Sequence, residues 1–157
     1  MAGKTVVLGV GNTLLSDEGV GVHVIERLRR ECTDLESVEF LDGGTLSFTL
    51  AGPMAEAEQL IIIDAAELDS PPGTLSLFRD AEMDSYLGRG KRRSVHEVSL
   101  IDLMAIAHLT GDLPSRRALI GIQPQAVDWG EIPTPEVAAA IPLACEMTLD
   151  LIREWQQ

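Results

Sequence analysis

Short apolar runs alternate along the chain with segments whose apolar positions recur every three or four residues. The short runs have the length and β-branched content of strands, and they cover residues 6–10, 38–41, 60–63 and 118–122. The run 60–63 is apolar throughout, which is typical of a central parallel strand buried on both faces. Leu75 and Leu77 alternate with polar residues, so the segment 74–78 predicts a strand nearer the edge of a sheet.

The helical spacing is clearest after the first strand. Val20, Val24 and Leu28 share one face of a predicted helix, and Ser16 precedes it as an expected N-cap. A capping-box pattern, S-x-x-E, at 94–97 predicts the start of a second helix, which continues beyond residue 100. Thr134 is an expected cap followed by Pro135 at the first position of a helix that ends near Trp155.

Other segments carry weaker signals. Residues 45–57 predict a poorly patterned helix, Pro142 predicts a kink in the last helix, and residues 88–93 predict an exposed basic loop. Strands that alternate with helices in this way indicate an α/β fold. We therefore expect one three-layer domain over residues 1–157, with a central, twisted, mostly parallel sheet and helices on both faces.

Charge narrows the possible partners. The 12 Lys and Arg residues against 25 Asp and Glu residues give a net charge of −13, which disfavours nucleic acids and anionic membranes as partners. The apolar runs are too short for a signal peptide or a membrane span, so we expect a cytoplasmic protein. Cys32 and Cys145 form no C-x-x-C pair and are expected to be reduced thiols.

Acidic residues follow three of the predicted strands. Glu18 and Asp17 come after the first strand, Asp42 after the second and Asp64 after the run 60–63, while His96 lies in a first helical turn. The carboxyl ends of parallel strands are where ligands bind in open α/β sheets. Two carboxylates and one imidazole suit a divalent transition metal, so Glu18, Asp64 and His96 form a candidate metal site. Each residue alone is more typical of a cap, a turn or an exposed surface position, and only their joint placement at one rim favours the metal site.

Two other features leave alternatives open. Gly9-Val10-Gly11 after a strand resembles part of a dinucleotide-binding turn, but Leu14 replaces the third glycine and Asp17 and Glu18 would repel a pyrophosphate. Trp129 lies in a predicted loop between Asp128 and Glu131. It is either a docking point or a cover for the core.

Four motifs, taken together, resemble those of the nickel–iron hydrogenase maturation endopeptidases. They are GVGNTLLSDEGVG at 9–21, LDGGT at 41–45, LIIIDA at 60–65 and SVHEV at 94–98. Their order and spacing cover essentially the whole chain. The resemblance implies a single α/β domain that removes a short C-terminal peptide from the precursor of a hydrogenase large subunit once nickel has been inserted, cutting after a basic residue.

The resemblance also implies roles for individual residues. Glu18, Asp64 and His96 match the family's metal-contacting positions, and Asp42 matches the aspartate of its second motif. Nickel is expected to arrive with the precursor, and other divalent ions can substitute for it. Asp42 is the candidate general base or substrate-positioning group. The protein is expected to act as a monomer that docks transiently.

Two further functions stay open at this point. A metal-sensing chaperone would use the same three residues to bind the immature subunit without cutting it. A Rossmann-like nucleotide-binding enzyme would use the turn at 9–14 instead.

Overall fold

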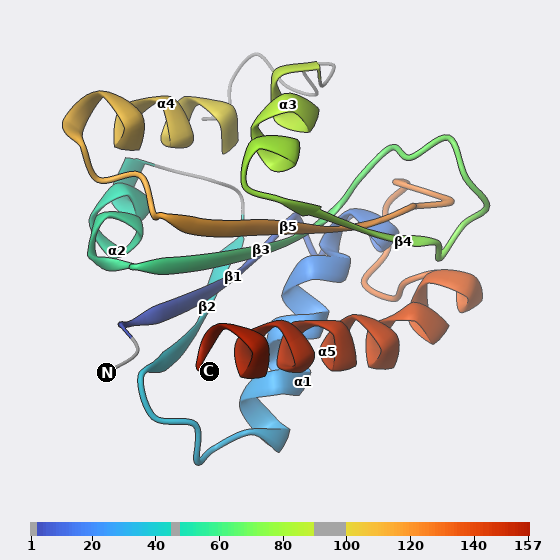
Figure 1. The fold of residues 1–157 in the computed structure, drawn as a ribbon. Helices are drawn as coiled ribbons and strands as arrows, with labels where there is room; N and C mark the ends of the chain where they lie inside the picture. The colour runs from blue at the N-terminus through green and yellow to red at the C-terminus, as the bar shows by residue number, and fades with distance from the viewer. Residues whose placement is uncertain (1–2, 45–47, 90–99) are drawn as a thin grey trace.

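A five-stranded sheet forms the middle layer of the protein (Figure 1). The computed structural model describes residues 3–44, 48–89 and 100–157. The strands are β1 (Thr5–Val10), β2 (Val38–Gly44), β3 (Gln59–Ala65), β4 (Leu75–Arg79) and β5 (Arg116–Ile122). Their order is β2-β1-β3-β5-β4, with β4 antiparallel to β5 and every other pair parallel. The mostly parallel sheet and the edge position of residues 74–78 are confirmed.

Helices cover both faces of the sheet. One face carries α1 (Val20–Glu31) and α5 (Pro135–Trp155), and the other carries α2 (Ala51–Glu56), α3 (Ala81–Arg89) and α4 (Leu100–Thr110) (Figure 1). Short 3₁₀ turns, η1 (Ser16–Gly19) and η2 (Phe48–Leu50), precede α1 and α2. The predicted three-layer α/β fold is confirmed. No helix in the described ranges combines the length and apolar character needed to cross a bilayer.

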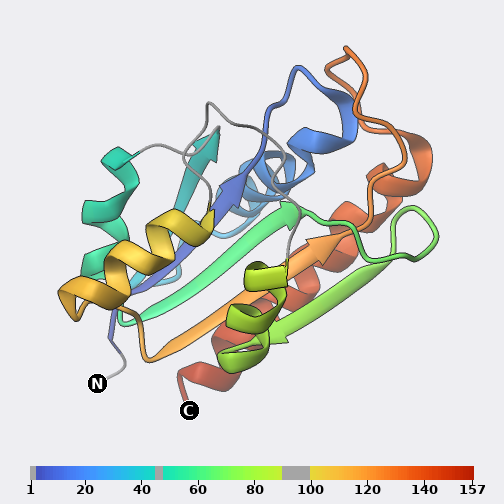
Figure 2. The same cartoon turned by 90° about the horizontal axis from the view of Figure 1, so that it is seen from above.

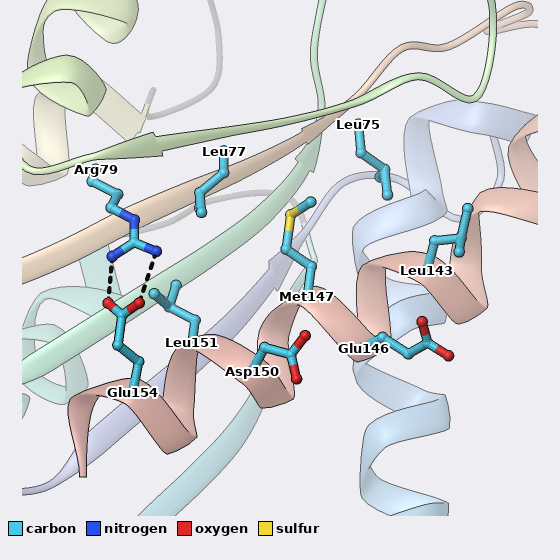
Figure 3. A pocket seen from close by; sticks show the side chains of 9 residues that line it. All are labelled: Leu75, Leu77, Arg79, Leu143, Glu146, Met147, Asp150, Leu151 and Glu154. Atoms are coloured by element: carbon cyan, nitrogen blue, oxygen red, sulfur yellow. Dashed lines mark hydrogen bonds and ion pairs between the residues drawn. The ribbon is translucent and has the colours of Figure 1, made fainter. Parts of the chain in front are cut away.

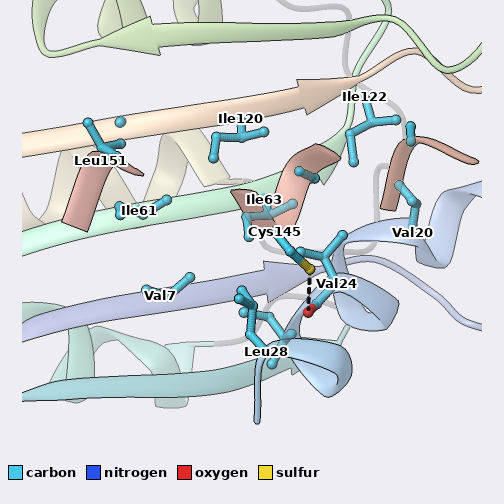
Figure 4. Close-up of a cluster of buried hydrophobic side chains, with 14 of the residues drawn as sticks. Val7, Val20, Val24, Leu28, Ile61, Ile63, Ile120, Ile122, Cys145 and Leu151 are labelled. Carbon is cyan, nitrogen blue, oxygen red and sulfur yellow. Dashed lines mark hydrogen bonds between the residues drawn. The ribbon is translucent and has the colours of Figure 1, made fainter. Parts of the chain in front are cut away.

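Alternation along β3 divides the core into two layers. Ile61 and Ile63 point to the α1 and α5 face (Figure 4), whereas Leu60 and Ile62 belong to the core on the face covered by α2, α3 and α4. All four side chains are fully buried, as the apolar run predicts. Burying each one favours the folded state by roughly 1.5–3 kcal/mol. Core packing therefore fixes the position of β3, and Asp64 is the sixth residue of this strand.

The capping role predicted for Ser16 is wrong. The N-cap of α1 is Gly19, and no side chain caps that helix. Ser16 has a φ of 51°, and its hydroxyl donates a hydrogen bond to the Asp128 carbonyl oxygen at 2.8 Å. The Ser16 hydroxyl therefore forms its hydrogen bond with a residue 112 positions away in the sequence, and not with the start of α1.

The second half of the chain contains one helix that the pattern does not predict. In α3, Met83, Tyr86 and Leu87 contact the core and the neighbouring positions are polar, so the apolar signal is short. Gly88 and Arg89 belong to this helix and not to a loop. The rest of the predicted basic loop, 90–93, and the capping box at 94–97 lie outside the described residues.

The last helix begins where the sequence places it. Thr134 is the N-cap of α5 and Pro135 opens it, and the helix continues past Pro142 to Trp155. The Thr134 side chain forms no capping hydrogen bond, because its hydroxyl donates to Asp17 instead.

Gly21 sets the distance between α1 and the sheet. A Cβ atom at this position would lie 2.1 Å from the carbonyl oxygen of Ile63 and 2.6 Å from that of Val10. Gly21→Ala is expected to push α1 away from the sheet and to lower the free energy of unfolding by about 1–3 kcal/mol, measured by urea denaturation. Gly52→Ala is the matched control, because nothing lies within 4 Å of its added Cβ in α2. Equal urea midpoints for the two variants would contradict this packing.

Candidate functional site

The strand order reverses between β1 and β3. From β1 the chain passes through α1, on one face, to β2, and from β2 it returns through α2, on the other face, to β3. Such a switch point leaves a crevice outside the carboxyl ends of the two strands, where ligands bind in open α/β sheets. The residues that follow β1 and those that end β3 therefore border the expected binding position.

Glu18 lies in η1, the first element after β1. Gly11 has a φ of +135°, and a Cβ there would lie 1.9 Å from the carbonyl oxygen of Glu18. A glycine at position 11 is thus needed for the turn to fold back and bring Glu18 over the end of β1. The 3₁₀ turn also contacts β3, and the Glu18 side chain is half-buried.

The same fold-back removes support for the nucleotide-binding alternative. Glu18 places its carbonyl oxygen over Gly11, and a Cβ at Gly19 would lie 2.5 Å from the Thr13 Cα. In a dinucleotide-binding turn, that space over the first glycines receives the pyrophosphate. Here the chain itself fills it.

Asp64 is the second-to-last residue of β3. It is half-buried, and its Oδ1 is shielded from solvent. Its Cα partner on β5 is Gly121, and the preceding residue, Ile63, pairs with Gly9 of β1. Because Gly121 has no side chain, none from β5 crowds Asp64 in register. The turn that carries Glu18 contacts β3, the strand that carries Asp64, and a shared metal site of the two residues stays a prediction.

Asp42 flanks β1 on the other side. It pairs in register with Gly9, is exposed, and its Oδ1 accepts a hydrogen bond from the Gly44 N–H at 2.8 Å. Val38 and Phe40, which share its parity, pack on the α1 and α5 face, whereas Asp64 shares the parity of Leu60 and Ile62. The two aspartates thus end at one rim of the sheet but leave it on opposite faces.

His96, the third predicted metal ligand, lies outside the described residues. Within 3–44, 48–89 and 100–157, no three His, Cys, Asp or Glu side chains converge as a metal site. Glu18 and Asp64 supply two oxygen donors that suit a divalent cation. The complete set of Glu18, Asp64 and His96 stays a prediction.

Asp17 is the site residue that sequence reasoning assigns to the wrong role. Its side chain is fully buried, not exposed in a first helical turn. Its carboxylate accepts hydrogen bonds from the backbone N–H groups of Gln125, Ala126 and Thr134 at 2.8, 2.9 and 2.7 Å, and from the Thr134 hydroxyl at 2.8 Å. This clamp ties the β5–α5 loop to the turn that carries Glu18 (Figure 2). No local pattern signals it, because the partners lie 108 to 117 residues away.

Hydrogen bonding sets the charge state of Asp17. Burial alone would raise the pKa of its carboxyl, but the N–H groups of Ala126, Gln125 and Thr134 and the Thr134 hydroxyl lower it below the ordinary value of 3.8. The side chain is therefore a carboxylate at neutral pH. It serves the fold of the site and not its chemistry.

Neither cysteine has the properties of a nucleophile. Both are free thiols, as the sequence predicts. Burial between α1 and α5 raises the pKa of Cys145 to about 11, and its Sγ lies 3.9 Å from the Val24 carbonyl oxygen (Figure 4). Burial and then the Glu31 charge raise the pKa of Cys32. Both thiols are protonated at neutral pH, which disfavours thiolate chemistry.

A groove of about 370 Å³ lies elsewhere, between β4 and α5 (Figure 3). Leucines 75, 77, 143 and 151 and Met147 form its apolar surface, and Arg79 forms an ion pair with Glu154 at one end. None of Glu18, Asp42 or Asp64 lines it. The residues that line this groove make it a poor candidate for the catalytic site.

Comparisons with known proteins find relatives over almost the whole chain. A family model described as hydrogenase maturation protease matches residues 22–151. The hydrogenase 2 maturation protease of Escherichia coli K12 is 37% identical over 152 residues, covering 96% of this chain and 92% of its own. The HupD hydrogenase expression/formation protein of Rhodobacter capsulatus is 39% identical over 97% of this chain and 72% of its own.

Solved structures give the same result. The hydrogenase maturating endopeptidase HybD from E. coli superimposes with a TM-score of 0.88 at 37% identity, covering 96% of this chain and 93% of that one. A nickel–iron hydrogenase maturation protease from Thermococcus kodakarensis superimposes with a TM-score of 0.75 at 25% identity, covering 94% of this chain and 98% of that one.

Proposed function

Because this chain belongs to the hydrogenase maturation protease family and is an endopeptidase of hydrogenase maturation, we propose that it removes the C-terminal extension of a nickel-loaded large-subunit precursor. One observation carries the proposal. The 3₁₀ turn that carries Glu18 contacts β3, the strand that carries Asp64, at the switch point between β1 and β3. Two carboxylates bordering a crevice can bind a cation that a partner presents there.

Nickel is part of the substrate in this proposal. Glu18, Asp64 and His96 complete the coordination of the nickel ion that the precursor carries, so cleavage waits until nickel is in place. Other divalent ions can occupy the same ligands. The bound metal holds the scissile peptide in position, and it can also polarise the carbonyl group or activate a water molecule.

Asp42 has a separate task. Asp42 is exposed, and its side chain leaves the sheet on the opposite face from that of Asp64. Both features favour substrate positioning over proton transfer at the metal. The Gly44 N–H fixes one of its oxygens, which leaves the other to accept a hydrogen bond from the precursor backbone.

Water is the nucleophile that fits the described residues. Both thiols have raised pKa values, and the chain contains no G-x-S-x-G turn. We therefore expect reagents that acylate serine or alkylate cysteine at active sites to leave cleavage unchanged.

Mass spectrometry of the precursor tests the proposal. Purified precursor, nickel-loaded or nickel-free, is incubated with and without this protein, and its mass is followed with time. We expect a shorter product only with the protein and nickel together. An intact precursor that stays bound to the protein would support the metal-sensing chaperone, and shortening of both precursors at one rate would refute nickel recognition.

A further inference from the structure

Four apolar side chains are exposed at the rim that carries Glu18. Trp129 and Ile132 are 83% and 80% exposed, and Val127 is also exposed in the same β5–α5 loop. Leu14, from the turn after β1, joins them, because its carbonyl oxygen accepts a hydrogen bond from the Gly130 N–H at 2.9 Å. We call Leu14, Val127, Trp129 and Ile132 the rim patch. Figure 2 shows its two segments side by side.

The fold fixes the rim patch in place. Ser16 donates its N–H to the Gly130 carbonyl oxygen at 2.7 Å and its hydroxyl to the Asp128 carbonyl oxygen at 2.8 Å. The buried Asp17 carboxylate binds the loop at both ends, through Gln125 and Ala126 on one side and Thr134 on the other. The loop is thus held by bonds from inside while its large apolar side chains point away from the core. Clustered apolar exposure of this kind marks interaction surfaces.

The patch continues into the candidate site. Ser16 and Asp17, which anchor the loop, directly precede Glu18 in η1. Leu14 lies four residues before Glu18 in the turn after β1, so a polypeptide that approaches Glu18 from this side passes the rim patch. The substrate of the candidate site is therefore the molecule that we expect to bind the rim patch.

Charge describes the chemistry of that occupant. Residues 124–134 contain Asp128 and Glu131, both exposed, and no Lys or Arg. The whole chain carries −13, so a cationic partner is attracted to this rim and an acidic one is repelled. Apolar side chains between two carboxylates match a segment that carries both apolar and basic residues.

We propose that the rim patch is the docking surface for the precursor polypeptide, and that it binds an apolar segment carrying basic side chains beside the scissile region. This inference rests on the proposed function, since the precursor is the substrate it names. Trp129 supplies the main contact, and Asp128 and Glu131 bind the basic side chains. Buried aromatic anchors dominate many protein interfaces, and tryptophan is enriched among them.

Cleavage kinetics of the nickel-loaded precursor test the docking surface. The double variant Trp129→Ala/Ile132→Ala is expected to raise KM about 10- to 30-fold with kcat unchanged, because docking contacts contribute to binding and not to the reaction itself. Leu109→Ala is the matched control, since Leu109 is also 83% exposed but lies in α4, and its KM should not change. Asp128→Asn/Glu131→Gln should raise KM at low salt and less at high salt.

The outcomes separate this inference from the proposed function. If the wild-type protein shortens the precursor and the Trp129/Ile132 variant does so with the same KM, the docking surface is refuted and the protease assignment stands. If the wild-type protein leaves the precursor intact, the assignment fails. Docking is then measured as binding of precursor to immobilised protein, which the double variant should weaken about tenfold or more. A wild-type dimer that becomes monomeric in the double variant would assign the patch to self-association and overturn the inference.

Discussion

Asp64→Asn is expected to lower kcat/KM for precursor cleavage by about 100-fold or more, with little effect on the fold. The substitution keeps the shape of a half-buried side chain but removes the negative charge proposed to contact nickel. Metal contacts contribute several kcal/mol to transition states, and each 1.4 kcal/mol corresponds to about tenfold in rate. The measurement is the rate of product formation, followed by mass spectrometry.

Matched variants show whether the effect belongs to the site. Glu18→Gln and His96→Ala should cause similar losses, because all three residues are assigned to one nickel ion. Asp34→Asn removes the same charge from an exposed loop before β2, at the far end of the sheet, and should cleave normally. Normal cleavage by Asp64→Asn, at an unchanged melting temperature, would contradict the metal-recognition proposal.

Asp17→Asn is expected to lower the free energy of unfolding by about 2–3 kcal/mol. The carboxylate accepts bonds from Gln125, Ala126 and Thr134 on both of its oxygens. In the amide, an NH₂ group replaces one oxygen and faces partly buried N–H donors, which then lack an acceptor. Urea denaturation at pH 7 gives the difference. Asp150→Asn is the control, since its ion pair with Arg153 is exposed and should contribute less than about 1 kcal/mol.

The difference in unfolding free energy between the wild type and Asp17→Asn should depend on pH in a defined direction. The pKa of Asp17 is lower in the folded protein than its ordinary value of 3.8. A carboxyl of this kind adds stability above its unfolded pKa and loses that contribution as pH falls through its folded pKa. The gap between the wild type and Asp17→Asn should thus be constant above about pH 5 and shrink below about pH 3.8. A gap that widens on acidification would refute the assignment.

The two variants separate chemistry from architecture. Asp64→Asn should affect cleavage and not stability. Asp17→Asn should affect stability first, and cleavage through the β5–α5 loop that presents Trp129. Excess substrate should therefore restore cleavage by folded Asp17→Asn but not by Asp64→Asn.

Local signals predicted the elements that depend on neighbouring residues. The unbroken run 60–63 required burial on both faces, which only a central strand provides, and β3 has that position. Thr134-Pro135 marked the start of α5 because a proline at the first helical position loses no hydrogen bond. Placing Glu18 and Asp64 at one rim followed from the rule that parallel strands end on the same side.

Long-range contacts were not predictable in this way. Ser16 has the residue type of an N-cap, and Asp17 has the charge that favours a helix start, yet both bind the β5–α5 loop. A local cap competes with distant donors for the same oxygen atoms. Which donor binds depends on where the fold brings residues 125–134.

The sequence by itself determined the α/β fold class, the order of most elements and the acidic residues at the strand ends, because periodicity and strand-end chemistry are local properties. Only the tertiary structure decided that the turn carrying Glu18 contacts β3, and that Asp42 and Asp64 leave the sheet on opposite faces. It alone also decided that Asp17 is buried and Trp129 exposed. The physical reason is that burial and hydrogen bonding depend on which distant segments come into contact. Strand order and register determine those contacts.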